Sequence, residues 1–171
     1  MIYKILHGVE IQIDEEDLKK ITSTLLPNNN WTIGGNGHVV GWCLVNGKRK
    51  QLQLSRLVMD CFDHTKDVDH KFHDKTDNRK QNLRICSRSD NQCNRRKLEI
   101  AYSKYKGVSF EKCRNKWIAR ISYKGKSKNL GRFNSELDAA LAYDRAALIV
   151  HGVYAHLNFS TIVWTGEVKL P

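Results

Sequence analysis

Three short runs of alternating residues, followed by one longer apolar stripe, constrain the fold of this chain more than any other feature. Residues 105–110, 116–121 and 128–133 place basic side chains between aromatic and aliphatic ones, which is the pattern of half-buried β-strands. The stripe repeats at helical spacing and is formed by Leu137, Ala140, Leu141, Ala147 and Leu148. Ser135 stands where it can cap this helix, and Gly152 stands where it can end it. We therefore predict a three-stranded antiparallel sheet with one helix covering its back.

The front of this predicted sheet is suited to contact a polyanion. The chain carries 29 lysine and arginine residues against 18 acidic ones, which gives a formal net charge of +11. Residues 95–132 alone hold thirteen basic and two acidic side chains, whereas residues 1–47 hold three basic and five acidic ones. Lysine and arginine would meet phosphates, and planar side chains would reach bases. This distribution of charge indicates a polyanionic partner.

Five motifs in this region occur in order: Tyr-Lys-Gly-Val, Lys-Trp-Ile-Ala, Leu-Gly-Arg-Phe, Ala-Tyr-Asp-Arg-Ala-Ala and His-Leu-Asn-Phe. Through them, residues 103–159 resemble the DNA-binding domain of plant ethylene-response factors, also called the Apetala-type domain. In that family the sheet enters the major groove of DNA. The resemblance implies a DNA-facing set that consists of Lys106, Gly107, Ser109, Trp117, Arg120, Lys128 and Arg132. Arg114 and Lys116 add basic side chains to the same region.

Four positions depart from the residues that are usual in that family. Lys106 and Ser109 stand where arginine is usual, Arg120 stands where an acid is usual, and Asn129 replaces a second tryptophan. Lysine lacks the planar fork with which arginine makes two hydrogen bonds to guanine. The target preference of the family therefore does not transfer to this chain. Trp117 has the alternative role of a core residue.

A second stretch, residues 68–96, combines a carboxylate, an imidazole and several carboxamides with surrounding arginines and lysines. The imidazole of His70 has an ordinary pKa of about 6.5 and could take a proton from water near neutral pH. Asp69 and Asn91 offer oxygen atoms to a hard cation, which would neutralise charge on a phosphate and its leaving oxygen. Magnesium suits such ligands, and manganese would serve the same geometry, with one ion per site. These residue types predict a metal-dependent attack on a phosphodiester.

The spacing in this stretch resembles the ββα-metal site of the HNH endonucleases, of the phage and intron-encoded homing type. Two predicted strands precede a helix, and Asn82 and Asn91 follow His70 by twelve and twenty-one residues. The resemblance, which covers about residues 2–96, implies that His70 is the general base and that Asp69 and Asn91 bind the metal. It also implies that Asn82 braces the hairpin of the catalytic site. The basic side chains expected to contact DNA here are Arg79, Arg84, Arg95 and Arg96.

The predicted fold class is α+β, with a ββα-metal core in the first part of the chain. An HNH nuclease domain is expected over residues 1–96, and residues 1–67 form its N-terminal β-rich scaffold. A linker at residues 97–104 leads to the ethylene-response-factor-type domain at residues 105–159. Residues 160–171 are a C-terminal tail.

Asn46 and Gly47 lie between two alternating runs, which is a strong signal for a β-hairpin. Three consecutive cations follow, namely Lys48, Arg49 and Lys50. They either touch DNA or occupy a solvated hairpin end.

The two regions together predict a metal-dependent DNA endonuclease of the homing type, which nicks or cleaves duplex DNA as a monomer. The alternative is a sequence-specific DNA-binding regulator that keeps the nuclease fold without catalysis. A basic RNA-binding or ribosome-associated protein forms a third class. That class would account for the charge but not for the polar stretch at residues 68–96.

The five cysteines include no Cys-x-x-Cys pair, which favours reduced thiols in a cytosol over a structural zinc site. The chain also contains no long apolar run, no lipidation signal and no signal peptide. We therefore expect a cytoplasmic protein with neither a membrane partner nor a small-molecule cofactor.

Overall fold

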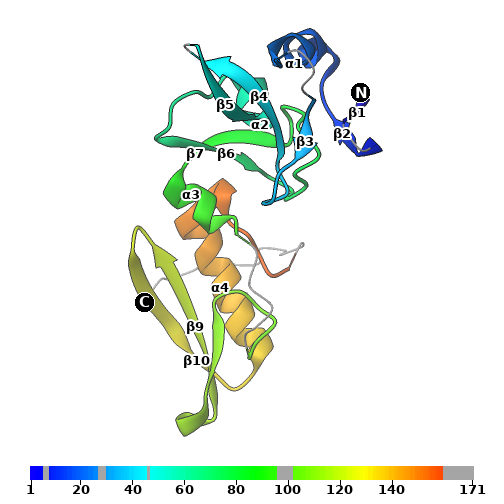
Figure 1. The fold of residues 1–171 in the computed structure, drawn as a ribbon. Coiled ribbons are helices and arrows are strands. Elements are labelled where there is room, and N and C mark those ends of the chain that lie inside the picture. The colour runs from blue at the N-terminus through cyan, green and yellow to red at the C-terminus, as the bar shows by residue number, and fades with distance from the viewer. Residues whose placement is uncertain (6–7, 27–29, 46, 96–101, 160–171) are drawn as a thin grey trace. The chain divides into compact units, whose positions relative to one another are not determined.

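The structure is a computed structural model, and it describes residues 1–5, 8–26, 30–45, 47–95 and 102–159. The chain divides into two compact units, Met1–Arg88 and Ser89–Pro171 (Figure 1). Both units mix helices and strands. Most of the predicted linker at residues 97–104, and all of the predicted tail at residues 160–171, lie outside the described residues. Within the described ranges, no helix is both long enough and apolar enough to cross a membrane.

The first unit is built from short strands and short helices. In chain order these are β1 (Ile2–Lys4), β2 (Glu10–Gln12), the 3₁₀-helix η2 (Glu15–Asp17), α1 (Leu18–Thr24), β3 (Thr32–Ile33), β4 (Val39–Val45), β5 (Lys48–Gln53), α2 (Leu54–Val58), β6 (Lys66–His70) and β7 (Leu83–Ser87). β1 pairs with β2, β3 to β5 form a three-stranded sheet, and β6 pairs with β7; every pair is antiparallel. The hairpin predicted from Asn46 and Gly47 corresponds to β4 and β5.

A hydrophobic core holds these elements together. Ile11, Ile21 and Leu54 are wholly buried, although they come from β2, α1 and α2. The indole nitrogen of Trp31 donates a hydrogen bond to the carbonyl oxygen of Ile21 at 3.1 Å. Gly41 in β4 lies so close to this indole that a Cβ there would be 2.9 Å from its Cε3 atom. This contact defines the inner face of the three-stranded sheet.

The second unit contains the sheet and helix that the alternating runs predict. Its elements are α3 (Arg88–Cys93), β8 (Val108–Glu111), the 3₁₀-helix η3 (Lys112–Arg114), β9 (Lys116–Tyr123), β10 (Lys126–Phe133), α4 (Glu136–His151) and η4 (Gly152–Tyr154). β9 is the central strand between β8 and β10, and both pairs are antiparallel. Figure 1 shows α4 running along one face of this sheet. The predicted three-stranded antiparallel sheet is confirmed.

Helix α4 begins and ends as predicted, but it buries a different stripe. The Oγ of Ser135 accepts a hydrogen bond from the amide of Leu137 at 3.1 Å, and Gly152 follows the helix with a φ of 53°. The apolar side chains that α4 buries are Ala139, Ala140, Tyr143, Ala146 and Ala147. Leu137, which the predicted stripe included, is 48% exposed. Small alanine side chains let the helix backbone approach the sheet closely, which larger leucines at these positions would prevent.

Candidate nucleic-acid interface

The alternation of side chains along β9 separates the two faces of the second unit's sheet. Ala119 and Ile121 are buried in the two clusters that include residues of α4, so they mark the back of the sheet. Arg120 lies between them in sequence, so its side chain points to the opposite face, where it is exposed. Asn129 of β10 is the cross-strand partner of Arg120 and is exposed as well.

We call the face that carries Arg120 the front of the sheet. By alternation and cross-strand register it comprises Ser109, Glu111, Lys116, Ile118, Arg120, Ser122, Ser127, Asn129 and Arg132. Four of the residues predicted to bind DNA therefore share this face, three of them basic. Arg95 is exposed after α3, and Arg96 lies outside the described residues.

Sequence analysis missed Glu111, which organises the basic side chains at one end of the front. Its carboxylate accepts hydrogen bonds from Nε of Arg132 at 2.7 Å and from Nη1 of Arg114 at 2.9 Å. The hydrogen bond from Arg132 is the main reason why the pKa of Glu111 is lowered. Glu111 is the only acidic residue between residues 100 and 135, and this isolation was the available signal. The carboxylate restricts both guanidinium groups to defined orientations.

Three predicted DNA-binding residues lie elsewhere. Trp117 packs against the alanine cluster between the sheet and α4, which is the core role considered as its alternative. Lys128 is exposed, but it is the cross-strand partner of Ile121. Its side chain therefore points to the back of the sheet, not to the front. Lys106 donates a hydrogen bond from Nζ to the carbonyl oxygen of Cys93 at 2.6 Å. Burial is the main cause of its lowered pKa.

Two arginines that were expected to contact DNA from the first unit are held by neighbouring carboxylates. Nη2 of Arg84 lies 2.6 Å from Oδ2 of Asp69, and both side chains are largely buried. Nη2 of Arg79 lies 2.8 Å from Oδ2 of Asp77. Their charges are compensated inside the unit, so a duplex would have to compete with these carboxylates.

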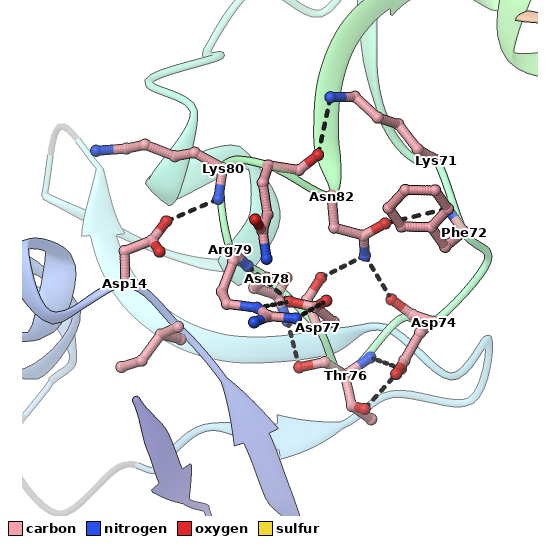
Figure 2. A network of polar contacts seen from close by, with 12 residues as sticks. Asp14, Lys71, Phe72, Asp74, Thr76, Asp77, Asn78, Arg79, Lys80 and Asn82 are labelled. Atoms are coloured by element: carbon pink, nitrogen blue, oxygen red, sulfur yellow. Dashed lines mark hydrogen bonds and ion pairs between the residues drawn. The ribbon is translucent and has the colours of Figure 1, made fainter.

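Asn82 is the centre of a buried polar network between β6 and β7. It is 0% exposed, and its Nδ2 donates to the carbonyl oxygens of Asp74 at 3.2 Å and Asp77 at 2.7 Å. Its Oδ1 accepts a hydrogen bond from the amide of Phe72 at 3.0 Å. Figure 2 shows these bonds converging on the Asn82 side chain. Asn82 therefore braces the segment that connects the two strands.

His70 at the end of β6 is buried and lies beside a second histidine. Its Nε2 is 3.4 Å from Oδ1 of Asn78, and its ring centroid is 5.4 Å from that of His38. Burial lowers the pKa of His70. The pKa of His38 is lowered to about 4, mainly by burial and further by the nearby charges of His70 and Lys75. Both rings are neutral near neutral pH.

A ββα-metal core at the residues predicted to hold a metal is not shown. Asp69 is engaged by Arg84, and Asn91 belongs to the second unit rather than the first. Among the described residues, no three His, Cys, Asp or Glu side chains gather closely enough to hold a metal ion. The predicted magnesium or manganese ion stays a prediction.

The stability of the first unit is expected to decrease as the pH falls from about 6.5 towards about 4, the lowered pKa of His38. Unfolded imidazoles take up protons over this window while the buried ones stay neutral, so acid favours the unfolded state. Thermal unfolding of the full chain across this window measures the effect. His38→Gln is expected to reduce this pH dependence without abolishing it, because the pKa of His70 is lowered as well. His64→Gln at an exposed position is the control; equal pH dependence in all three proteins would contradict the assignment.

The second unit thus combines three antiparallel strands, a helix packed on their back and a front that carries basic side chains. Residues 103–152 match the AP2 domain family, and we refer to this part of the chain as the AP2 domain. The match lies entirely within the second unit.

Several plant proteins are similar to this part of the chain. APETALA2-like protein 2 of Oryza sativa subsp. indica is 37% identical over 67 residues, which is 39% of this chain and 15% of that protein. Dehydration-responsive element-binding protein 2E of Arabidopsis thaliana is 37% identical over 76 residues, 39% of this chain and 31% of that protein. Ethylene-responsive transcription factor ERF024 of Arabidopsis thaliana is 43% identical over 61 residues, 34% of this chain and 33% of that protein. The chain thus spans a third or less of the length of these relatives.

These comparisons contradict the predicted endonuclease. The relatives are named as transcription factors and an element-binding protein, not as nucleases or other hydrolases. The prediction of an HNH homing endonuclease is therefore wrong. It relied on the order of polar residues in the sequence. In the folded chain, Asp69 is neutralised by Arg84, and His70 is buried against Asn78.

Proposed function

We propose that this chain is a non-catalytic regulator that binds duplex DNA sequence-specifically, as a monomer, through the front of the AP2 sheet. The observation that carries the proposal is the exposed front itself, where Arg120 and Arg132 lie on adjacent strands with α4 packed behind them. The major groove of B-DNA admits two adjacent β-strands, such as β9 and β10, and arginine there makes two hydrogen bonds to guanine. All five cysteines are unpaired, which supports an intracellular place of action.

The details of the front argue for a target preference of its own. Asn129 occupies a central position and uses its Oδ1 to accept a hydrogen bond from the amide of Gly131 at 3.0 Å. Its Nδ2 remains the group that can donate to an acceptor on a base edge. Arg132 presents a guanidinium whose orientation is set by Glu111. Arg120 brings a donor fork to a position where family members usually have an acid.

The rival class, an RNA-binding basic protein, differs in the groove that it would require. A-form RNA has a deep and narrow major groove that a sheet cannot enter, so the front would lose its base contacts. Competition of the full chain for labelled duplex DNA by unlabelled duplex DNA and duplex RNA separates the two. We expect DNA of the selected sequence to compete far better than RNA. Equal competition would favour the RNA-binding class.

Arg120→Ala is expected to weaken binding to the preferred duplex by roughly ten- to a hundredfold, because a bidentate arginine contact to guanine is lost. The preferred sequence is first selected from a randomised duplex pool with the full chain, and affinities are then measured at one fixed salt concentration. Arg145→Ala is the matched control, because Arg145 is exposed on α4, behind the sheet.

The selection itself supplies the second readout for this prediction. Arg120→Ala should relax the preference at one or two base pairs and leave the others unchanged. If Arg120→Ala and Arg145→Ala bind the same duplex with wild-type affinity and select the same sequence, the front of the sheet does not read DNA.

A further inference from the structure

A long acid-free segment in the first unit was not used by the function proposed above. Residues 18–59 contain no aspartate or glutamate, but they contain six basic residues: Lys19, Lys20, Lys48, Arg49, Lys50 and Arg56. Three of these six cations are consecutive and lie at the start of β5, directly after the turn of the β4–β5 hairpin. All three are exposed. The hairpin therefore presents concentrated positive charge with no acid of its own segment to compensate it.

The same hairpin exposes an apolar and cationic surface on its outer face. The inner face is occupied at Gly41 by the indole of Trp31, so residues of opposite parity point outward. Trp42 and Leu44 have this outward parity and are 39% and 58% exposed. Leu44 is the cross-strand partner of Arg49, whose guanidinium carbon lies 4.8 Å from the centroid of the Trp42 ring. We define the outer hairpin surface as Trp42, Leu44, Arg49 and Gln51, and Lys48 and Lys50 flank it with the opposite parity.

This combination of groups matches duplex DNA among the polyanions. The cation–π contact holds the guanidinium of Arg49 flat on an indole, which limits its motion before any ligand arrives. The side chains of Lys48 and Lys50 alternate with that of Arg49 along β5. The β4–β5 hairpin therefore carries cations on both of its faces. A two-stranded β-ribbon fits the major groove, and cations on both of its sides can reach phosphates of both strands.

We propose that the β4–β5 hairpin is a second duplex-DNA contact of this chain, so that the two units bind one duplex together. The inference rests on the proposed function, because the AP2 sheet supplies the sequence-specific contact. The hairpin supplies phosphate contacts and adds affinity without selecting a sequence. Two linked weak contacts bind far more tightly than either alone, because the second contact forms at a high effective concentration.

The test uses the full chain and a variant that carries Lys48→Gln, Arg49→Gln and Lys50→Gln. Affinity for a long duplex containing the selected AP2 sequence is measured over a series of salt concentrations. The variant is expected to lose at least about tenfold in affinity. The slope of log affinity against log salt should become shallower by about 2 to 3, since each phosphate contact accounts for about 0.9. Hydroxyl-radical footprinting should show a shorter protected region.

The matched control removes the same charge from other exposed positions of the first unit. It carries Lys4→Gln, Lys19→Gln and Lys66→Gln, and it should keep the wild-type salt slope and footprint. Thermal unfolding of both variants verifies that the first unit remains folded. If the hairpin variant and this control have the same affinity, salt slope and footprint, the hairpin contact is overturned.

Failure of the proposed function gives a different pattern. The hairpin variant should select the same DNA sequence as the wild type, whereas Arg120→Ala should alter that selection. If Arg120→Ala has no effect while the hairpin variant loses binding, the AP2 sheet does not make the sequence-specific contact. The hairpin contact with DNA would still be supported. If the hairpin variant binds DNA normally but loses binding to polyglutamate, its partner is an acidic polypeptide and the proposal is overturned.

Discussion

Gly107→Ala is expected to unfold the AP2 domain and, with it, to abolish binding of duplex DNA. Gly107 precedes β8 with a φ of +75°, and a Cβ built on it would lie 1.9 Å from Cδ2 of Tyr143. Tyr143 is 3% exposed and is packed among residues of α4 and β9, so its ring would have to leave its packed position. The left-handed backbone costs about 1 to 2 kcal/mol for an L-residue. Overpacking the core adds about 1 to 3 kcal/mol.

The measurement is thermal unfolding of the full chain together with its affinity for the selected duplex. Gly125→Ala is a closely matched control, because Gly125 has a φ of +76° but a Cβ there would meet no described atom within 4 Å. It should incur only the backbone cost and keep DNA binding. Equal losses of stability in the two variants would show that contact with Tyr143 does not govern this position.

Asn82→Ala is expected to destabilise the first unit by about 2 to 4 kcal/mol, because it leaves one buried and two partly buried backbone groups without their partner. Those groups are the amide of Phe72 and the carbonyl oxygens of Asp74 and Asp77. Water cannot replace the lost carboxamide, since Asn82 is 0% exposed. Asn82→Asp should also be destabilising, because it keeps an acceptor for Phe72 but replaces the donor with a carboxylate that faces two carbonyl oxygens.

Urea unfolding of the full chain measures this loss, and hydrogen exchange of peptides from β6 and β7 assigns it to the first unit. Gln81→Ala is the control, because Gln81 is the exposed neighbour of Asn82. Its carbonyl oxygen, which accepts a hydrogen bond from Nζ of Lys71, is retained in the variant. Faster exchange should be confined to the first unit in Asn82→Ala. A wild-type urea midpoint for Asn82→Ala would contradict a bracing role.

The AP2 sheet was predictable because its signals are local. Alternation over residues 116–121 predicted a strand that the structure extends to Lys116–Tyr123, and the predicted cap at Ser135 is present. The hairpin at Asn46 and Gly47 followed in the same way from turn chemistry. Such signals act between residues that are neighbours in the chain, so they can be recognised without knowledge of the remaining structure.

The endonuclease prediction failed for the complementary reason. A run of Asp, His and Asn residues shows which chemical groups are close in sequence, but not what each group is bonded to. Asp69 is opposite Arg84 only because β6 and β7 pair in a particular register. That cross-strand neighbour turns a candidate metal ligand into half of a buried ion pair.

The sequence by itself determined the order of strands, turns and helix in the AP2 domain, and the basic character of its surface. Only the tertiary structure decided which face of the sheet α4 covers, and with it that Arg120 points outward while Trp117 packs inward. A one-residue shift in strand parity exchanges the two faces. The choice is made by long-range packing of the alanines of α4 against Ala119, which no local pattern encodes.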